Sequence, residues 1–405
     1  MTPLWRSGSL SISALVFLLF AACGGGEDGA RSGGEREAGI FATLELEAEY
    51  TEPFSALMTV REREDGTVMA ADPLSQVLLR VDLASNAADT LGRVGGGPQE
   101  YRQPDQVFPL PADSTLLVDL GKGQLTVIDP QGTFHSGPKM AVVREGSPLV
   151  IIQPRFVDDE GRLYFVGGFW SGDQPQDSLQ VSRFERSSGE VETLGWTWRT
   201  PPIVTRIDGG VRTSQIQMSP RDDWAAGPDG SFAIIRANGY SVEWHLPDGQ
   251  VVLGPPTQVE TPAITDEDKY AYFQAPGPAG LQVSVFGGSD GAVDVSMTRR
   301  GGSGRSRDEI DLTRQEWAEV YPPFRPERSS ISPWGKLWVQ RWFHPLDAPL
   351  MDVFDRGGER LGSVELPQGR RQVGWGTTAV GEPAIYLVRT DEFDLKWLER
   401  YRILR

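Results

Sequence analysis

Residues 65–82 read DGTVMAADPLSQVLLRVD, and this stretch decides the fold. An Asp-Gly pair, which favours a tight turn, precedes a short apolar run at 67–71. A polar break follows, and a second apolar run occupies 77–82. The order of turn, strand, break and strand predicts two short neighbouring β-strands joined by a connection.

The same unit recurs along the chain. Its turn pairs are Asp65-Gly66, Asp113-Ser114, Glu160-Gly161, Asp229-Gly230, Trp334-Gly335 and Glu382-Pro383. Three of the five steps between these pairs are 47 or 48 residues long, and the other two are 69 and 105. Repeats of about 40–50 residues with several short strands each are typical of β-propeller blades.

The two ends of the chain belong to one blade. The last unit supplies only three strands, which we expect within 372–403. Residues 41–50 alternate leucine and alanine with glutamate, a pattern that predicts a strand with one buried face. We therefore expect this N-terminal strand to complete the last blade and to close the ring.

Several segments resemble a known family. Residues 92–107, GRVGGGPQEYRQPDQV, look like the blade junction of NHL-type repeats. Residues 335–341 (GKLWVQR), 353–358 (VFDRGG) and 361–367 (LGSVELP) resemble bacterial six-bladed β-propeller lipoproteins with NHL-like or TolB-like repeats. The resemblance covers about residues 41–405 and implies an all-β propeller of six four-stranded blades. It implies little about function, because propellers include enzymes, binding proteins and scaffolds.

The longest step points to an insertion at about 257–322. Two helix starts are expected there, at Thr265 with Asp268 three residues on, and at Thr313 with Glu316 three residues on. Two strands are expected between them, so a seventh blade is an alternative. We favour a partly helical insertion on six blades, because the helices interrupt the unit.

The first forty residues predict export of the protein and its attachment to a membrane. Residues 1–22 hold one charge and an apolar run too short to span a bilayer, which is typical of an export signal. The chain's single cysteine, Cys23, follows two alanines and resembles a bacterial lipobox. The resemblance implies lipidation of Cys23, with residues 23–40 as a flexible tether to a propeller at 41–405. The alternative is an ordinary signal peptide with an incidental cysteine.

The expected location is therefore the cell envelope. Glycine after Cys23 favours the outer membrane, with the propeller facing the periplasm or the cell surface. The net charge of −17 repels phosphate backbones and argues against nucleic acid as a partner. No disulfide is expected within one chain that has a single cysteine.

Candidate ligand-binding residues come from comparing the units. The residue that ends the second strand is charged in five of them, at Asp72, Asp119, Arg236, Arg341 and Arg389. In an up-and-down blade these positions share one face with the loops that join the blades, so the insertion should overhang the same mouth of the channel. Arginine forks suit carboxylate, phosphate or sulfate, which predicts an anionic or zwitterionic ligand. The alternative is that each charge caps a turn or pairs with a neighbour.

The sequence supports a catalytic site less well than a ligand-binding site. Only three histidines occur, His135, His245 and His344, and two of them fall outside the expected channel strands, so a three-histidine zinc site is not expected. The metal alternative is a calcium site at Asp72 and Asp119 with nearby carbonyl oxygens. The aromatic residues Trp334, Trp338, Trp342 and Phe343 are expected in the packing between blades, with sugar stacking by an exposed Trp342–Phe343 pair as the alternative.

These patterns favour a monomeric, membrane-anchored binding or scaffold module without catalysis or cofactor. Its partner would be an envelope protein, a peptide or a glycan. The alternative is a propeller hydrolase, lyase or lactonase-like enzyme that uses channel carboxylates, with or without Ca²⁺.

Overall fold

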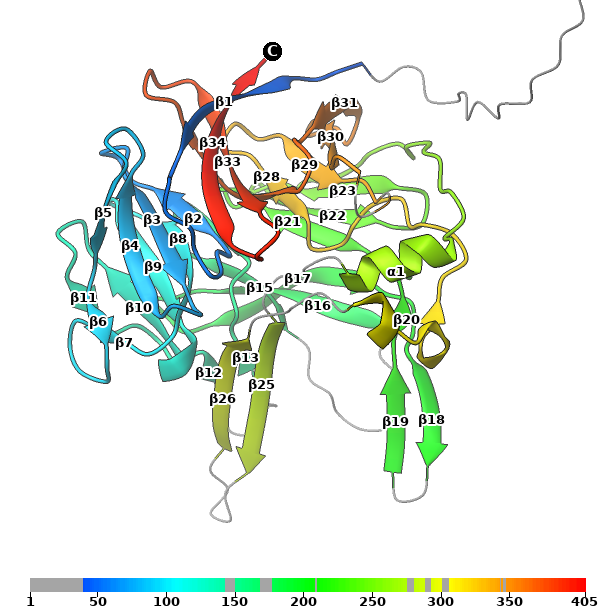
Figure 1. Ribbon diagram of the computed structural model, residues 1–405, viewed down its shortest axis with the longest axis horizontal. Helices are drawn as coiled ribbons and strands as arrows, with labels where there is room; N and C mark the ends of the chain where they lie inside the picture. The colour runs from blue at the N-terminus through cyan, green and yellow to red at the C-terminus, as the bar shows by residue number, and fades with distance from the viewer. Residues whose placement is uncertain are drawn as a thin grey trace, which may run out of the picture. The chain divides into compact units, whose positions relative to one another are not determined.

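Six antiparallel sheets of four strands each form a ring in the computed structural model (Figure 1). The structure describes residues 39–142, 150–167, 177–207, 210–274, 280–287, 293–300, 306–342, 344 and 347–405. The six-bladed propeller that the repeats and the family resemblance predict is thereby confirmed. Within each blade the strands follow chain order from the channel outward, except in the blade that joins the two ends of the chain.

The blades have the following strands, innermost first. Blade 1 is β2 (Val60–Glu62), β3 (Val68–Asp72), β4 (Val77–Asp82) and β5 (Ala87–Thr90), and blade 2 is β8 (Pro104–Leu110), β9 (Ser114–Asp119), β10 (Gln124–Ile128) and β11 (Phe134–His135). Blade 3 is β14 (Phe156–Val157), β15 (Leu163–Gly167), β16 (Ser178–Phe184) and β17 (Val191–Trp198), and blade 4 is β21 (Asp223–Ala226), β22 (Phe232–Arg236), β23 (Ser241–His245) and β24 (Val251–Leu253). Blade 5 is β28 (Ser329–Ile331), β29 (Leu337–Gln340), β30 (Leu350–Phe354) and β31 (Arg360–Glu365), and blade 6 is β32 (Arg370–Thr377), β33 (Pro383–Thr390), β34 (Lys396–Leu404) and β1 (Thr43–Glu49).

The N-terminal strand closes the ring, as predicted. β1 pairs antiparallel with β34, from Thr43 opposite Leu404 to Glu49 opposite Glu399. On the inside, neighbouring innermost strands contact one another around the channel. The hydroxyl of Ser330 on β28 and the side-chain oxygen of Gln372 on β32 share a hydrogen bond that joins blades 5 and 6.

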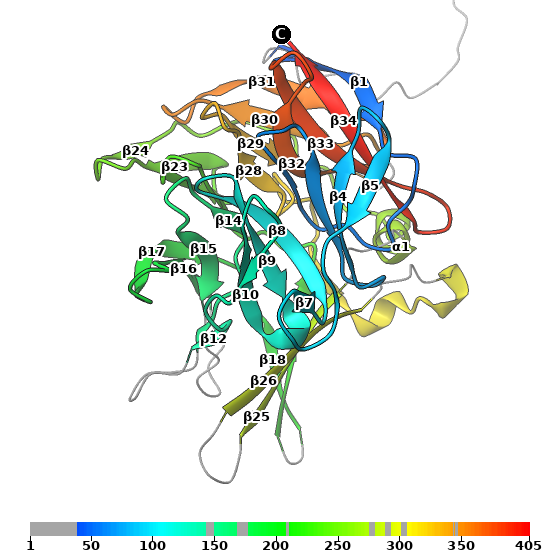
Figure 2. The same cartoon turned by 90° about the vertical axis from the view of Figure 1, so that its left-hand side faces the viewer.

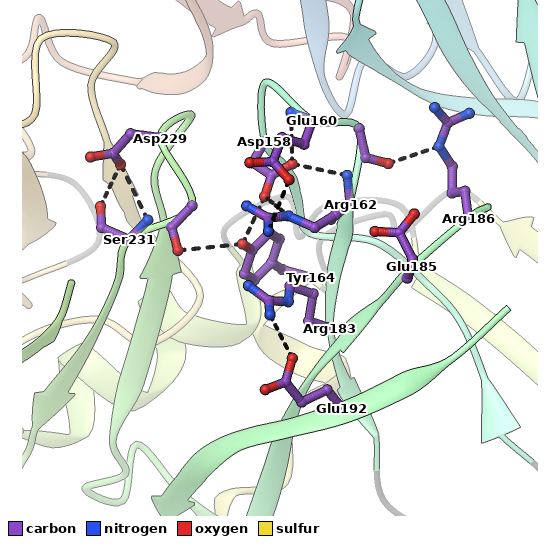
Figure 3. Close-up of polar contacts among 12 residues, drawn as sticks. Asp158, Glu160, Arg162, Tyr164, Arg183, Glu185, Arg186, Glu192, Asp229 and Ser231 are labelled. Atoms are coloured by element: carbon purple, nitrogen blue, oxygen red, sulfur yellow. Dashed lines mark hydrogen bonds and ion pairs between the residues drawn. The ribbon is translucent and has the colours of Figure 1, made fainter. Parts of the chain in front are cut away.

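The recurring turn pair has a clear physical role. Gly66, Gly161, Gly230 and Gly335 all have φ between 77° and 83°, a left-handed conformation that glycine adopts without strain. The preceding acid often holds the turn: the Asp229 carboxylate accepts hydrogen bonds from the backbone and the hydroxyl of Ser231 (Figure 3). The repeat therefore marks the connection between the first two strands of each blade.

The same turns tie blades together. Figure 3 shows Asp158, at the first turn of blade 3, accepting hydrogen bonds from Arg162 and from the hydroxyl of Tyr164. The carbonyl oxygen of Gly230, on blade 4, lies 3.4 Å from the same hydroxyl. Burial, followed by the charge of Asp158, raises the pKa of Tyr164, so this phenol stays a hydrogen-bond donor at neutral pH.

Tryptophans fill the space between blades, as expected for Trp338. That residue is fully buried, and its ring lies 5.1 Å from the ring of Trp375 on blade 6. Trp334 packs against the buried apolar group that contains Trp338, and its ring contacts that of Trp375 edge-on at 5.4 Å. Trp244 is also fully buried and donates its indole N–H to the carbonyl oxygen of Asp355 on blade 5. These contacts seal neighbouring blades against each other.

The insertion between β24 and β28 is partly helical, as expected. Its second half lacks the helix that was expected to begin at Thr313. Helix α1 (Asp266–Gln274) begins after Thr265, whose backbone N–H and hydroxyl both donate to Asp268, as the predicted cap requires. The helix expected at Thr313 is wrong. Thr313 lies in a single 3-10 turn (Leu312–Arg314) that Asp311 caps, and the next residues form the short strand β27 (Glu316–Trp317).

The remaining part of the insertion forms a hairpin and no seventh blade. β25 (Gly280–Gly287) and β26 (Val293–Arg300) pair only with each other. β27 instead runs parallel to β20 (Ile216–Gln217), which belongs to the connection between blades 3 and 4. Pairing of β27 with β20 competes with a longer helix, because each residue can use its backbone groups only once.

The extra strand pairs in the connections between blades lie on one side of the ring. Connections from an outer strand to the next inner strand carry β6 (Arg93–Val94) with β7 (Glu100–Tyr101), β12 (Ala141–Val142) with β13 (Val150–Ile151), β18 (Ile203–Ile207) with β19 (Gly210–Ser214), and β25 with β26. Figures 1 and 2 show β18–β19 and β25–β26 extending from the same side. The innermost strands all begin at this side, because each is entered from such a connection.

Candidate functional site

The two predicted aspartates hold backbone turns. Asp72 is 2% exposed and accepts hydrogen bonds from the backbone N–H groups of Ser55, Ala56, Leu74 and Ser75. Asp119 is fully buried and accepts from the backbone N–H groups of Arg102, Gln103 and Lys122. The oxygens of both carboxylates therefore face N–H donors. Within the described ranges, no group of three or more His, Cys, Asp or Glu side chains could hold a metal ion.

Two of the predicted arginines form ion pairs within their blades. Arg236 donates to Glu243 at 2.6 Å and to Asp222 at 2.9 Å. Arg389 of blade 6 donates to Glu49 at 2.7 Å and to Glu399 at 3.0 Å. Both guanidinium groups are thus neutralised by carboxylates of this chain.

The third predicted arginine is buried. Arg341 is 2% exposed and donates to the carbonyl oxygens of Pro323 at 3.1 Å and Glu260 at 3.4 Å. None of the five predicted positions lines the central cavity. Their role in ligand binding stays a prediction, and the lipidation residue Cys23 lies outside the described residues.

The central channel contains a cavity of about 890 Å³ between the innermost strands of all six blades. Four acidic side chains line it, Glu62, Asp222, Asp223 and Glu327. Twice as many arginines do so: Arg61, Arg155, Arg199, Arg221, Arg299, Arg325, Arg328 and Arg371. The channel is therefore positively charged inside a chain whose net charge is −17.

Some of these arginines have carboxylate partners. Arg155, which directly precedes β14, donates to both oxygens of Asp223 at 2.6 and 3.2 Å. Arg221 pairs with Glu327 at 3.2 Å. Arg61 pairs with Asp113 at 2.6 Å, while its Nε and one terminal nitrogen are buried without a hydrogen-bond partner.

Three other arginines have no carboxylate partner among the described residues, and we call Arg325, Arg328 and Arg371 the three-arginine cluster. Arg328 directly precedes β28, Arg325 lies three residues before Arg328, and Arg371 is the second residue of the neighbouring inner strand β32. All three keep some surface exposed to the cavity that they line. They come together because the inner strands of blades 5 and 6 begin at the same end of the channel.

The members of the cluster are held to different degrees. Arg371 donates to the carbonyl oxygens of Leu57 at 2.6 Å and Met58 at 3.3 Å. The guanidinium carbon of Arg325 lies 5.8 Å from the ring centroid of Trp342, within cation–π range. Arg328 makes neither a hydrogen bond nor an ion pair with any side chain or backbone group that the structure describes.

Burial and neighbouring positive charges both lower the pKa values of two arginines in the cluster. Burial, and then the positive charges of Arg371 and Arg325, hold the pKa of Arg328 well below its usual value, although the negative charge of Glu327 opposes them. Burial and the charges of Arg299 and Arg325 lower the pKa of Arg371 to about 10. Arginine nevertheless stays protonated at neutral pH, so the free protein keeps these like charges close together.

The insertion reaches the same end of the channel. Its helix contributes Tyr272, and its hairpin contributes Arg299, to the cavity wall. Arg299 donates to Asp105 of β8 at 2.7 Å through one terminal nitrogen, and both side chains are buried. Gln103 accepts a hydrogen bond from the backbone N–H of Arg299 at 3.0 Å. The hairpin is thereby fixed to blade 2, across the ring from the blades that flank the insertion.

Apolar side chains form much of the rest of the wall. Phe156 and Trp224 contact each other edge-on at 5.3 Å and carry the guanidinium of Arg155 on their faces. Further along the inner strands, Ile331 and Val373 line the same cavity. The cavity thus combines a cationic end with an apolar body, an arrangement that suits a ligand with one anionic group and an apolar part.

The fold and this site together define a six-bladed β-propeller with an arginine-lined central channel. No family model matches the chain, and no curated protein matches it. Among solved structures, the chain is similar to a gluconolactonase from Xanthomonas campestris (11% identity, TM-score 0.39, 91% of this chain and 99% of that chain covered). It is also similar to regucalcin, a calcium-binding protein from Agrobacterium tumefaciens (12%, 0.37, 90% and 97%), and to virginiamycin B lyase from Staphylococcus aureus (11%, 0.37, 89% and 98%). Similarity at this level assigns no activity to the chain.

Proposed function

We propose that this propeller is a non-catalytic binding protein whose central channel takes a small organic anion. The observation that carries the proposal is Arg328, a guanidinium inside the channel without a hydrogen-bond or ion-pair partner among the described residues, next to two further arginines that lack a carboxylate. A buried charge without a partner is costly, and natural proteins keep such groups mainly where they bind something. An anion would supply the missing acceptor.

The apolar wall supports an organic ligand over an inorganic ion. An anion alone would use only the cationic end, whereas Ile331, Val373 and the Phe156–Trp224 pair offer an apolar surface beside it. Burial of apolar area contributes about 25 cal/mol per Å², so a hydrocarbon or aromatic group of the ligand would add to its affinity.

We further propose that the protein works at the cell envelope as a monomer anchored by lipid at Cys23. The lipobox-like sequence before Cys23 and the glycine-rich tether up to residue 40 support this location. No helix among the described residues is long and apolar enough to cross a membrane. Binding of a small molecule at the channel is compatible with a protein or glycan partner elsewhere on the same propeller.

The test is calorimetric titration of the purified full-length protein with benzoate and with benzamide, which has a similar shape but no charge. We expect benzoate to bind and benzamide not to bind. Arg328→Gln should lose benzoate binding, whereas Arg80→Gln, at an exposed ion pair with Asp89 on blade 1, should retain it. Recovery of unchanged ligand supports binding without catalysis, and conversion of the ligand would favour the enzyme alternative.

A further inference from the structure

The number of guanidinium groups without a carboxylate partner among the described residues constrains the anion. The cluster brings three positive charges to one end of the cavity, and none of them has a carboxylate partner in the described part of the chain. A carboxylate offers one negative charge and two oxygens in a plane. A phosphate monoester at neutral pH offers close to two negative charges and three terminal oxygens in a tetrahedral arrangement. Three guanidinium forks therefore match a phosphate better than a carboxylate in both charge and number of acceptors.

The charged groups around the three-arginine cluster do not neutralise its positive charge. Most charged groups that face the cluster or line the same cavity form ion pairs, which are Arg155–Asp223, Arg221–Glu327, Arg299–Asp105, Arg61–Asp113 and Arg236–Asp222. Glu62 accepts hydrogen bonds from Thr377 and from the hydroxyl of Tyr386, and Arg199 and Tyr272 are the other charged or titratable residues of the lining. Each carboxylate in these pairs already accepts from an arginine outside the cluster. Asp113 even serves two arginines, since Arg63 also donates to it at 3.3 Å. The excess positive charge is thus available to a ligand.

The cluster is also prepared for a ligand before binding. Backbone carbonyl oxygens hold Arg371, and Trp342 supports the guanidinium of Arg325. Holding the donors in advance lowers the entropy lost when an anion binds. No acceptor among the described residues occupies the side-chain N–H groups of Arg328, so its five donors can serve the ligand.

We propose that the channel binds a phosphate monoester as its dianion, with the phosphate on Arg325, Arg328 and Arg371 and the organic group along the apolar wall of the cavity. This inference rests on the proposed function and specifies the ligand class of that same site. It makes a distinction that anion binding alone does not make, because only a phosphate monoester changes its charge between pH 5 and pH 8, with a second pKa near 6.

The experiment compares three probes with a common ring on the full-length protein: phenyl phosphate, phenyl sulfate and benzoate, each titrated by calorimetry from pH 5 to pH 7.5. We expect phenyl phosphate to bind tightest at pH 7.5, and its affinity to fall about tenfold by pH 5, as the dianion is lost. Phenyl sulfate keeps one charge throughout and should bind with a flat profile. Its profile reports any titration of the protein itself.

Variants tie the effect to the cluster. Arg328→Gln and Arg371→Gln should each weaken phenyl phosphate about ten- to hundredfold at pH 7.5 and reduce the pH dependence. Arg80→Gln should change neither. Arg328→Lys keeps the charge without the planar fork, and should lose part of the affinity while keeping the pH dependence. Thermal unfolding of each variant identifies any that fails to fold, and the other cluster variant then decides.

The outcomes separate the two proposals. If benzoate or phenyl sulfate binds as tightly as phenyl phosphate, or if the phenyl phosphate profile is flat, the phosphate inference is wrong and anion binding stands. If none of the three probes binds, both proposals fail. Octyl phosphate, titrated in parallel, distinguishes the source of the group: a large gain over phenyl phosphate indicates a single-chain lipid, and equal affinity indicates a small soluble ester.

Discussion

Arg299 on β26 and Asp105 on β8 are ion-paired although 194 residues separate them in the chain. The carboxylate of Asp105 is fully buried, and Arg299 is 6% exposed. The pair fixes a hairpin from the insertion between blades 4 and 5 onto blade 2. The insertion therefore covers the end of the channel where the three-arginine cluster lies.

Asp105→Asn should destabilise this contact strongly, because it leaves Arg299 buried with no charged partner on β8. We expect the free energy of unfolding to fall by about 3–5 kcal/mol, measured by urea denaturation. The double variant Asp105→Leu/Arg299→Met removes both charges and should be much closer to the wild type. Equal losses in the free energy of unfolding for the two variants would contradict the prediction that an unpaired, buried Arg299 causes the destabilisation.

Arg328→Gln should stabilise the free protein while it weakens ligand binding. The substitution removes a guanidinium that has no partner and repels its neighbours, so the free energy of unfolding should rise by about 1 kcal/mol. Arg155→Gln is the matched comparison, since Arg155 lines the same cavity but is paired with Asp223. That variant should lose about 3–5 kcal/mol. A destabilised Arg328→Gln protein would mean that Arg328 has a structural role.

The Arg155–Asp223 pair should make stability sensitive to acid. Burial alone would raise the pKa of Asp223, but the charge and hydrogen bonds of Arg155 and Ser329 lower it overall. An acid with a lowered pKa in the folded state stabilises the protein above its ordinary pKa of about 4, and this contribution is lost as the pH falls through the lowered value.

The measurement is urea denaturation of the wild type and of Asp223→Asn between pH 7 and pH 3. The difference in free energy of unfolding should be constant from pH 7 to pH 5 and should shrink below about pH 4. A difference that is independent of pH would contradict the lowered pKa.

Asp72→Ala tests whether that residue caps a turn or binds a ligand. Four backbone N–H groups donate to its carboxylate. Their loss should cost about 2 kcal/mol of stability, measured by thermal or urea unfolding, with unchanged affinity for channel ligands. Weaker ligand binding by a folded Asp72→Ala protein would instead support the predicted ligand-binding role.

Cys23→Ser should release the protein from the membrane. The sequence predicts lipidation of this residue, so the wild type should enter the detergent phase on Triton X-114 partitioning and incorporate labelled palmitate. The variant should remain in the aqueous phase without label. A variant that still partitions into detergent would point to an attachment other than Cys23.

The sequence predicts the propeller well because its turns are local. Neighbouring residues determine the conformation of Gly66 and Gly230 and the hydrogen bonds between Asp229 and Ser231. The repeat can therefore be recognised in the sequence. The ring closure by β1 is also predictable, because the last blade lacks one strand and residues 41–50 alternate as an edge strand does.

The cluster could not be found in the same way. Arg325 and Arg328 lie in the segment before β28, and Arg371 lies at the start of β32, so only the closed ring brings them together. Counting charged residues at the ends of second strands led instead to Arg236 and Arg389, which carboxylates of their own blades neutralise. Charged residues at the starts of first strands were the signal that could have identified the channel lining.

The pairing of β1 with β34 sets the order in which the molecule can be completed during synthesis. The first strand of the propeller leaves the ribosome before the other strands of the ring, yet its partner β34 is the last of those strands to be made. Five blades can form while the chain grows, but the sixth has to wait for the C-terminal residues. Until then β1 is an unpaired edge strand open to association with other chains, so the most vulnerable stage is the nearly finished ring.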